Sequence, residues 1–233
     1  MSEYRKRRLA TVFIIAAIVI SFGLWQDFST HQSTPEAVQK APVLPEGSTP
    51  ALSSLETLAE KGRAPKTGYS REQFGGGWRE SGNCTTREII LARDLEQTGV
   101  QDCKVYSGTL QDPYTNKTIQ FQRGAATSSL VQIDHVVALS DAWQKGAQAL
   151  TPEQREDLAN DPLELLAVQG KANQDKSDGD AATWLPPNKS YRCRYVARQV
   201  AVKQKYSLWV TVAEKSAIKN ILQQCPAQRL PVQ

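Results

Sequence analysis

Residues 131–143 read VQIDHVVALSDAW, and the acid–imidazole pair Asp134-His135 stands directly after an apolar run. The run predicts a short strand over residues 130–133 that leads into the pair. A histidine at a strand end sits on a fixed backbone and titrates near neutral pH, which suits proton transfer. Neighbouring side chains alternate between the faces of a strand, so the pair shares one site only if this alternation relaxes at the strand end. An isolated pair of this kind is usually structural, so the surrounding elements have to decide.

The elements around this pair mix short strands with helices, which predicts an α+β domain. Several of the helices open with Thr followed three residues later by Glu or Gln, the pattern of a capping box. Further strands are expected at residues 104–106, 118–122 and 163–168, and helices at 51–62, 86–97, 138–149, 151–160, 170–178, 191–205 and 211–225.

The chain resembles the exported HNH-family endonucleases of the type common in actinobacteria. The segment around Asp134-His135 looks like the first half of that family's catalytic unit, and the resemblance extends over nearly all of residues 68–225. The other stretches that carry it are 83–87 (NCTTR), 112–115 (DPYT), 160–168 (NDPLELLAV), 173–178 (NQDKSD) and 184–187 (WLPP). The resemblance implies a ββα-metal nuclease core with flanking helices.

The same resemblance implies a role for each polar residue of the core. His135 matches the general base that deprotonates the attacking water. Asp134 and Asn173 match the ligands of one divalent cation, for which their hard oxygen atoms favour Mg²⁺ or Mn²⁺. The family's middle Asn normally orients the histidine, but this chain has Glu164 at that position, and Asn160 is the rival for the role. A glutamate there could accept a hydrogen bond from the imidazole and would raise the pKa of the histidine.

Two basic residues are candidates for holding substrate phosphates. Arg87 lies in the matched upstream stretch, and Lys176 lies in the stretch that carries Asn173. Solvated surface charge is the competing interpretation for Arg87. The formal net charge of +4 permits a polyanionic partner without requiring one.

The amino-terminal region predicts export. Residues 1–9 form a basic cytoplasmic flank, and residues 10–25 form an uncharged apolar run that is either a signal peptide or an uncleaved membrane anchor. Residues 26–65 are rich in proline and are interpreted as a linker that contains the uninvolved His31. The nuclease domain is expected at residues 66–226, followed by a tail at 227–233.

The four cysteines agree with an exported chain. Sequence alone leaves their pairing open, and Cys84 with Cys103 and Cys193 with Cys225 is the economical choice. A four-cysteine zinc site lacks the expected Cys-x-x-Cys spacing.

We therefore expect a metal-dependent endonuclease outside the cytoplasm that hydrolyses DNA, and RNA as a further substrate, with little sequence specificity. Its expected partners are the nucleic acid and, if the anchor is retained, the membrane, with no obligate protein partner evident. The alternative is a catalytically inactive nucleic-acid-binding or cell-surface module that retains the nuclease fold, which Glu164 favours. A cell-wall hydrolase also fits export, but the histidine-rich ligand set of such zinc enzymes is missing.

Overall fold

The computed structural model of the chain describes residues 46–125 and 127–232. The predicted basic flank, the signal or anchor segment and His31 lie outside these residues. Among the helices that are described, none combines the length and the apolar character needed to cross a membrane. The structure is a mixed α+β fold with two disulfides.

A two-stranded antiparallel sheet lies at the centre of the described part of the chain. Strand β7 (Val131–His135) pairs antiparallel with β8 (Leu165–Gln169), and His135 lies opposite Leu165. Helix α6 (Gly170–Lys176) follows β8 without a gap. The chain between β7 and β8 forms α4 (Leu139–Gln144) and α5 (Pro152–Asn160), and α6 carries Asn173.

This two-stranded sheet lies between two hydrophobic clusters, one on each of its faces. Val131 and Ile133 pack into the smaller cluster, whereas Leu166 and Val168 pack into the larger one. Because side chains alternate along a strand, two buried faces require apolar residues at successive positions. This requirement explains why residues 165–168 of β8 are all apolar and do not alternate with polar residues.

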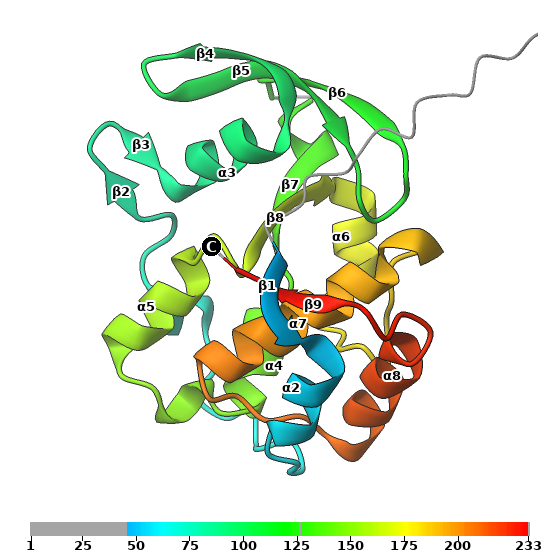
Figure 1. Ribbon diagram of the computed structural model, residues 1–233. Coiled ribbons are helices and arrows are strands. Elements are labelled where there is room, and N and C mark those ends of the chain that lie inside the picture. Colours follow the sequence, from blue (N-terminus) through cyan, green and yellow to red (C-terminus); the bar gives the residue numbers. More distant parts are fainter. Residues whose placement is uncertain (1–45, 126, 233) are drawn as a thin grey trace, which may run out of the picture. The chain divides into compact units, whose positions relative to one another are not determined.

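The smaller cluster is built by one helix and a three-stranded antiparallel sheet, which lie together at one end of the described fold (Figure 1). The helix predicted at residues 86–97 ends at Asp94, because the backbone is extended at Leu95 and Gln97 adopts a φ of 50°. The elements are α3 (Thr86–Asp94), β4 (Glu96–Gln101), β5 (Lys104–Gln111) and β6 (Thr118–Gln122).

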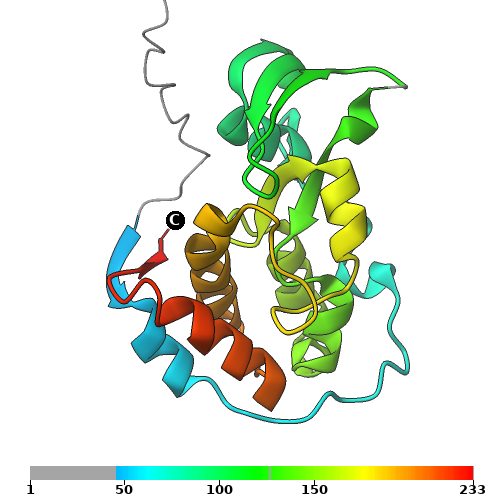
Figure 2. The same cartoon turned by 90° about the vertical axis from the view of Figure 1, so that its right-hand side faces the viewer.

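The larger cluster is built by helices that gather at the other end, together with residues from β8, β9 and the connecting segments (Figure 2). These helices are α2 (Ala51–Thr57), α4 (Leu139–Gln144), α5 (Pro152–Asn160), α7 (Arg192–Lys205) and α8 (Val212–Leu222). Lys145 is fully buried among them, and its ammonium lies 2.7 Å from carboxylate oxygens of Asp141, Asp180 and Glu214. Buried charges are tolerated when they are paired, so this ionic cluster fixes α4 to α8 and to the 178–184 segment.

The packed fold begins upstream of residue 66 and ends beyond residue 226, which corrects the predicted linker and tail. Strand β1 (Glu46–Pro50) pairs antiparallel with β9 (Arg229–Pro231), although these segments were expected to be linker and tail. Ala51 and Leu55 of α2 are fully buried in the larger cluster. The proline content hid a short strand and helix, because prolines are compatible with edge strands and with helix starts.

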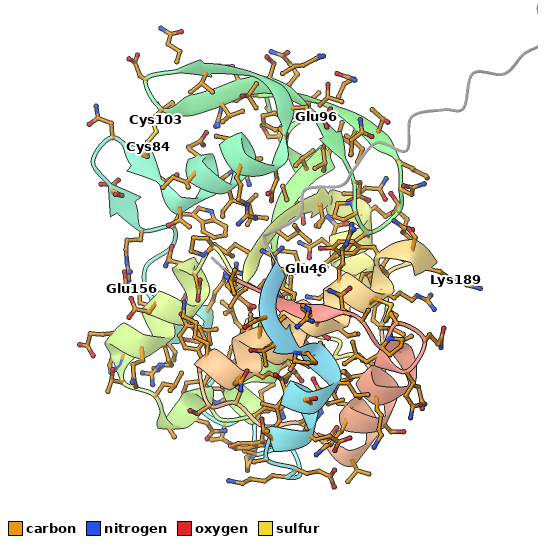
Figure 3. All side chains as sticks on the ribbon, viewed as in Figure 1. Glu46, Cys84, Glu96, Cys103, Glu156 and Lys189 are labelled. Atoms are coloured by element: carbon orange, nitrogen blue, oxygen red, sulfur yellow. A yellow bond between two sulfur atoms is a disulfide. The ribbon has the colours of Figure 1, made fainter. Side chains whose placement is uncertain are left out.

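Both disulfides join the locally spaced cysteines, which confirms the economical pairing. Cys84 of β3 (Cys84–Thr85), which pairs with β2 (Glu80–Ser81), bonds Cys103 at the turn between β4 and β5 (Figure 3). Cys193 at the start of α7 bonds Cys225 just after α8. Each bond restricts a segment of the unfolded chain and thereby stabilises the fold.

Candidate active site

His135 is the last residue of β7, and its ring is held on two sides. The imidazole stacks on the Trp78 indole, with ring centroids 5.8 Å apart and planes inclined by 5°. Its Nε2 lies 3.0 Å from the main-chain oxygen of Ala159. A carbonyl oxygen can only accept a hydrogen bond, so Nε2 carries the proton and Nδ1 keeps its lone pair. The geometry therefore fixes the tautomer in which Nδ1 can accept a proton.

The surroundings of this ring favour the neutral imidazole. Burial lowers the pKa of His135 to about 3, although the hydrogen bond to Ala159 acts in the opposite direction. The positive charges of Arg71 and Lys176 lower it further. At neutral pH the ring is uncharged, as a general base must be, but with a pKa of about 3 it is a weaker proton acceptor than the near-neutral imidazole that the sequence predicts.

A cavity of about 210 Å³ opens beside the imidazole. Its walls come from two parts of the chain: the segment before β2, and the residues around the ends of β7 and α5. The lining residues are Arg71, Glu72, Phe74, Gly75, Gly76, Gly77, Trp78, His135, Leu139 and Ala159. The cavity gives the ring of His135 a route to small molecules in solution.

Asp134 points to the face of the two-stranded sheet opposite His135, where it meets α6. Its buried carboxylate accepts hydrogen bonds from Lys176 Nζ at 2.9 Å and from the Tyr114 hydroxyl at 2.5 Å. Lys176 Nζ also donates to the main-chain oxygen of His135 at 2.8 Å. One buried ammonium thus neutralises Asp134 and fixes the end of β7.

Asn173 lies on the same face as Asp134. Its amide nitrogen donates to Gln132 Oε1 at 2.9 Å, and Gln132 is two residues before Asp134 in β7. A carboxylate and an amide oxygen on one face are the donor types that Mg²⁺ or Mn²⁺ prefers. The donor chemistry therefore fits a divalent cation, but the ammonium of Lys176 now occupies the carboxylate of Asp134, so cation and ammonium would compete for it.

Neither Glu164 nor Asn160 contacts the imidazole, which corrects the expected direct hydrogen bond. The Ala159 carbonyl takes that place instead. Glu164 is fully buried, and both its carboxylate oxygens lie 3.2 Å from the amide nitrogen of Val137, just after His135. Burial raises the pKa of Glu164 well above its usual value.

Asn160 ends α5 and directly follows Ala159, which lines the cavity. Its side-chain oxygen accepts a hydrogen bond from the Arg79 amide at 2.8 Å, and its amide nitrogen donates to the Glu156 carbonyl at 3.1 Å. This pair of bonds joins the segment of Trp78 to the end of α5. Asn160 therefore supports the ring of His135 indirectly, because it follows Ala159, whose carbonyl accepts the hydrogen bond from that ring.

The two predicted phosphate-binding residues both point into the protein. Arg87 is half-buried and donates to the Val131 carbonyl at 3.5 Å, and burial lowers its pKa. Lys176 is buried against Asp134. Neither side chain faces the cavity beside His135.

Sequence reasoning missed several residues that shape the site. Trp78 and Arg71 come from a stretch with no assigned element, and only its glycines at 75–77 signalled a tight turn. Tyr114 lies in the matched stretch 112–115, whose residues received no role, yet its hydroxyl donates to Asp134. The Ala159 carbonyl is a main-chain group, for which no side-chain pattern gives a signal.

Comparisons with known proteins agree with a nuclease-related site. Residues 86–221 match the family described as GmrSD restriction endonucleases, C-terminal domain. An uncharacterized secreted protein of Arthroderma benhamiae is 40% identical over 199 residues, which cover 84% of this chain and 94% of that protein. No solved structure matches the chain. The family range contains Asp134, His135 and Asn173, whereas Arg71 and Trp78 lie before it.

Proposed function

We propose that this chain, which belongs to the family of the GmrSD restriction endonuclease C-terminal domain, is an exported HNH-type endonuclease that hydrolyses phosphodiester bonds in DNA. The coarse activity, a nuclease acting on nucleic acid, follows from the family. The ββα-metal mechanism, the preference for DNA over RNA and the slight sequence specificity are parts of the proposal.

One observation carries the assignment: the imidazole of His135 is held as the neutral Nε2–H tautomer at the edge of a cavity. In the proposed reaction, Nδ1 takes a proton from a water molecule as the water oxygen bonds to phosphorus. The bond between phosphorus and the leaving ester oxygen then breaks, and that oxygen takes a proton from solvent. General-base catalysis of this kind contributes about 10²–10⁴-fold to a rate.

Asp134 and Asn173 would hold one Mg²⁺ or Mn²⁺ ion. Such an ion would supply positive charge that neutralises a phosphate. Neither Asp134 nor Asn173 lines the cavity beside His135, so for the ion to act on a phosphate there, the end of β7 has to turn Asp134 toward the cavity. For Asp134 to take this role, Lys176 has to release the carboxylate to which it donates at 2.9 Å. Asn173 would offer its amide oxygen, because its amide nitrogen already donates to Gln132.

The proposal includes export. The similar protein is described as secreted, and the two disulfides suit an oxidising compartment. The basic and apolar amino-terminal segment is proposed to direct the chain across the membrane and, if uncleaved, to anchor it there.

Plasmid digestion by the full chain tests the activity and its cation requirement together. We expect supercoiled DNA to be nicked and then linearised with Mg²⁺ or Mn²⁺, and to stay intact with a chelator. Single-stranded RNA in a parallel reaction measures the substrate preference. Cutting that persists at an unchanged rate in chelator would contradict the role of Asp134 and Asn173 but leave the nuclease assignment intact.

The inactive module is retained as a second candidate because Lys176 already neutralises the carboxylate that a cation would need. This candidate predicts DNA binding without nicking under every cation condition. A Glu164→Asn variant restores the family's residue at the middle position. Activity that appears only in this variant would favour the inactive module for the natural chain.

A further inference from the structure

An unpaired guanidinium lies in the cavity beside His135. Arg71 is exposed, it opens the short 3-10 helix η1 (Arg71–Phe74), and it lines the cavity. Over residues 46–125 and 127–232, no hydrogen bond or ion pair engages its side chain. An arginine that has no internal partner and faces a cavity is available for an anionic ligand.

The loop after η1 provides backbone donors at the same cavity. Gly75 and Gly77 adopt φ values of 96° and 130°, in the region that favours glycine. A Cβ added at Gly76 or Gly77 would meet no atom within 4 Å, so open space lies beside both residues. The amide N–H groups of Gly76 and Gly77 have no acceptor among the described residues. Backbone N–H groups in glycine-rich turns are suited to binding phosphate oxygens.

We propose that Arg71 and the loop of residues 75–77 bind a backbone phosphate of the nucleic acid in the cavity against His135. The inference rests on the proposed function, and it places the phosphate contact at Arg71 instead of at Arg87 or Lys176. The proposed contacts run from the guanidinium and the main-chain N–H groups to phosphate oxygens. Phosphate contacts position a nucleic acid without reading its sequence, which is consistent with slight specificity.

Glu72 sets a limit on the affinity of this site. Its carboxylate lines the same cavity, and hydrogen bonds from the Ser70 hydroxyl and from its own main chain lower its pKa. It is therefore negatively charged at neutral pH and repels an entering phosphate. Removing this charge is expected to strengthen binding, whereas removing the charge of Arg71 weakens it.

Binding of a fluorescently labelled DNA duplex to the full chain tests the site. Anisotropy is measured in chelator, so that no cutting occurs, over a series of salt concentrations. Arg71→Ala is expected to weaken binding by about tenfold or more and to reduce the salt dependence by about one phosphate contact. Arg71→Lys keeps part of the affinity, and Glu72→Gln raises it.

Lys189→Ala is the matched control, because it removes one exposed positive charge far from the cavity. Gly75, in the cavity wall, lies against the side chain of Glu156, and Lys189 lies on the opposite side of the molecule from Glu156 (Figure 3). A second variant, Gly76→Val, places its Cβ where no atom lies within 4 Å and should weaken binding as well. Urea unfolding of every variant verifies that the fold is intact.

The outcomes separate the inference from the proposed function. Equal binding by Arg71→Ala, Gly76→Val and Lys189→Ala overturns the inference, even if the natural chain cuts plasmid. Loss of DNA binding in Arg71→Ala and Gly76→Val, but not in Lys189→Ala, supports the inference. If that loss is found and the natural chain never cuts DNA, the proposed nuclease activity is refuted and the phosphate-binding site stands.

Discussion

At the residue scale, two lysines of α6 each pair with a carboxylate, and the two pairs differ in burial. The Lys176 side chain is 0% exposed beside Asp134, whereas the Lys171 side chain is 77% exposed beside Asp175. Breaking a buried pair leaves an uncompensated charge in the interior. We therefore expect Lys176→Met to lower the free energy of unfolding by about 3–5 kcal/mol.

Lys171→Met is the control on the same helix, and it should change the free energy of unfolding by about 1 kcal/mol at most. Urea denaturation in chelator compares the two variants. Equal effects would mean that Lys176 does not neutralise Asp134 in solution, and the proposed competition with a cation would lose its basis.

The depressed pKa of His135 predicts how stability depends on pH. The folded chain has a pKa of about 3 at this ring, whereas the unfolded chain has the ordinary value of 6.5. Between these values the unfolded chain binds a proton that the folded chain does not, so the free energy of unfolding falls as the pH falls. His135→Gln removes this titration and can still donate to the Ala159 carbonyl.

The natural chain should therefore lose about 3 kcal/mol more than His135→Gln between pH 7 and pH 4.5, at about 1.4 kcal/mol per pH unit. Urea unfolding at several pH values measures this difference. Parallel pH profiles for the two proteins would show that the ring is solvated, contrary to the structure.

The sequence selected polar residues in and around β7 but did not indicate their partners or the faces of the sheet on which they lie. Asp134, His135 and Asn173 could be selected because acid, imidazole and amide follow apolar strand residues at the spacing of a known family. The partner of His135 is a main-chain carbonyl, and the partner of Asp134 is a tyrosine from a turn. Such contacts depend on tertiary packing, which no local pattern encodes.

At the scale of elements, the strongest patterns predicted the structure best. The predicted strand at 118–122 coincides with β6 (Thr118–Gln122), and the apolar run at 163–168 became β8 (Leu165–Gln169). Strand β4 (Glu96–Gln101) was missed because it is polar, contains Gly99 and gains its stability from pairing with β5. Sheet pairing of this kind is a tertiary effect that overrides weak local preference.

Across the whole molecule, the segments outside residues 66–226 complete the larger core. Leu55 is fully buried in that core, and Leu230 of β9 is almost so. Each large apolar side chain lost from a core costs about 2–5 kcal/mol. A fragment that starts at residue 66 should therefore be at least about 5 kcal/mol less stable than one that starts at residue 46, because it lacks β1 and α2.

Thermal unfolding and near-UV circular dichroism of the two fragments check this expectation. Identical cooperative transitions would show that residues 46–65 are dispensable, as a linker would be. A broad or absent transition in the shorter fragment alone supports the wider domain boundary.

The decisive measurement is the rate of plasmid nicking by His135→Gln against the natural chain, at one fixed Mg²⁺ concentration and neutral pH. We expect the variant to lose about 10²–10⁴-fold in rate and to retain DNA binding, because only the proton acceptor is removed. Nicking by the variant at the rate of the natural chain would contradict this expectation, since the reaction would then proceed without the imidazole on which the site is built.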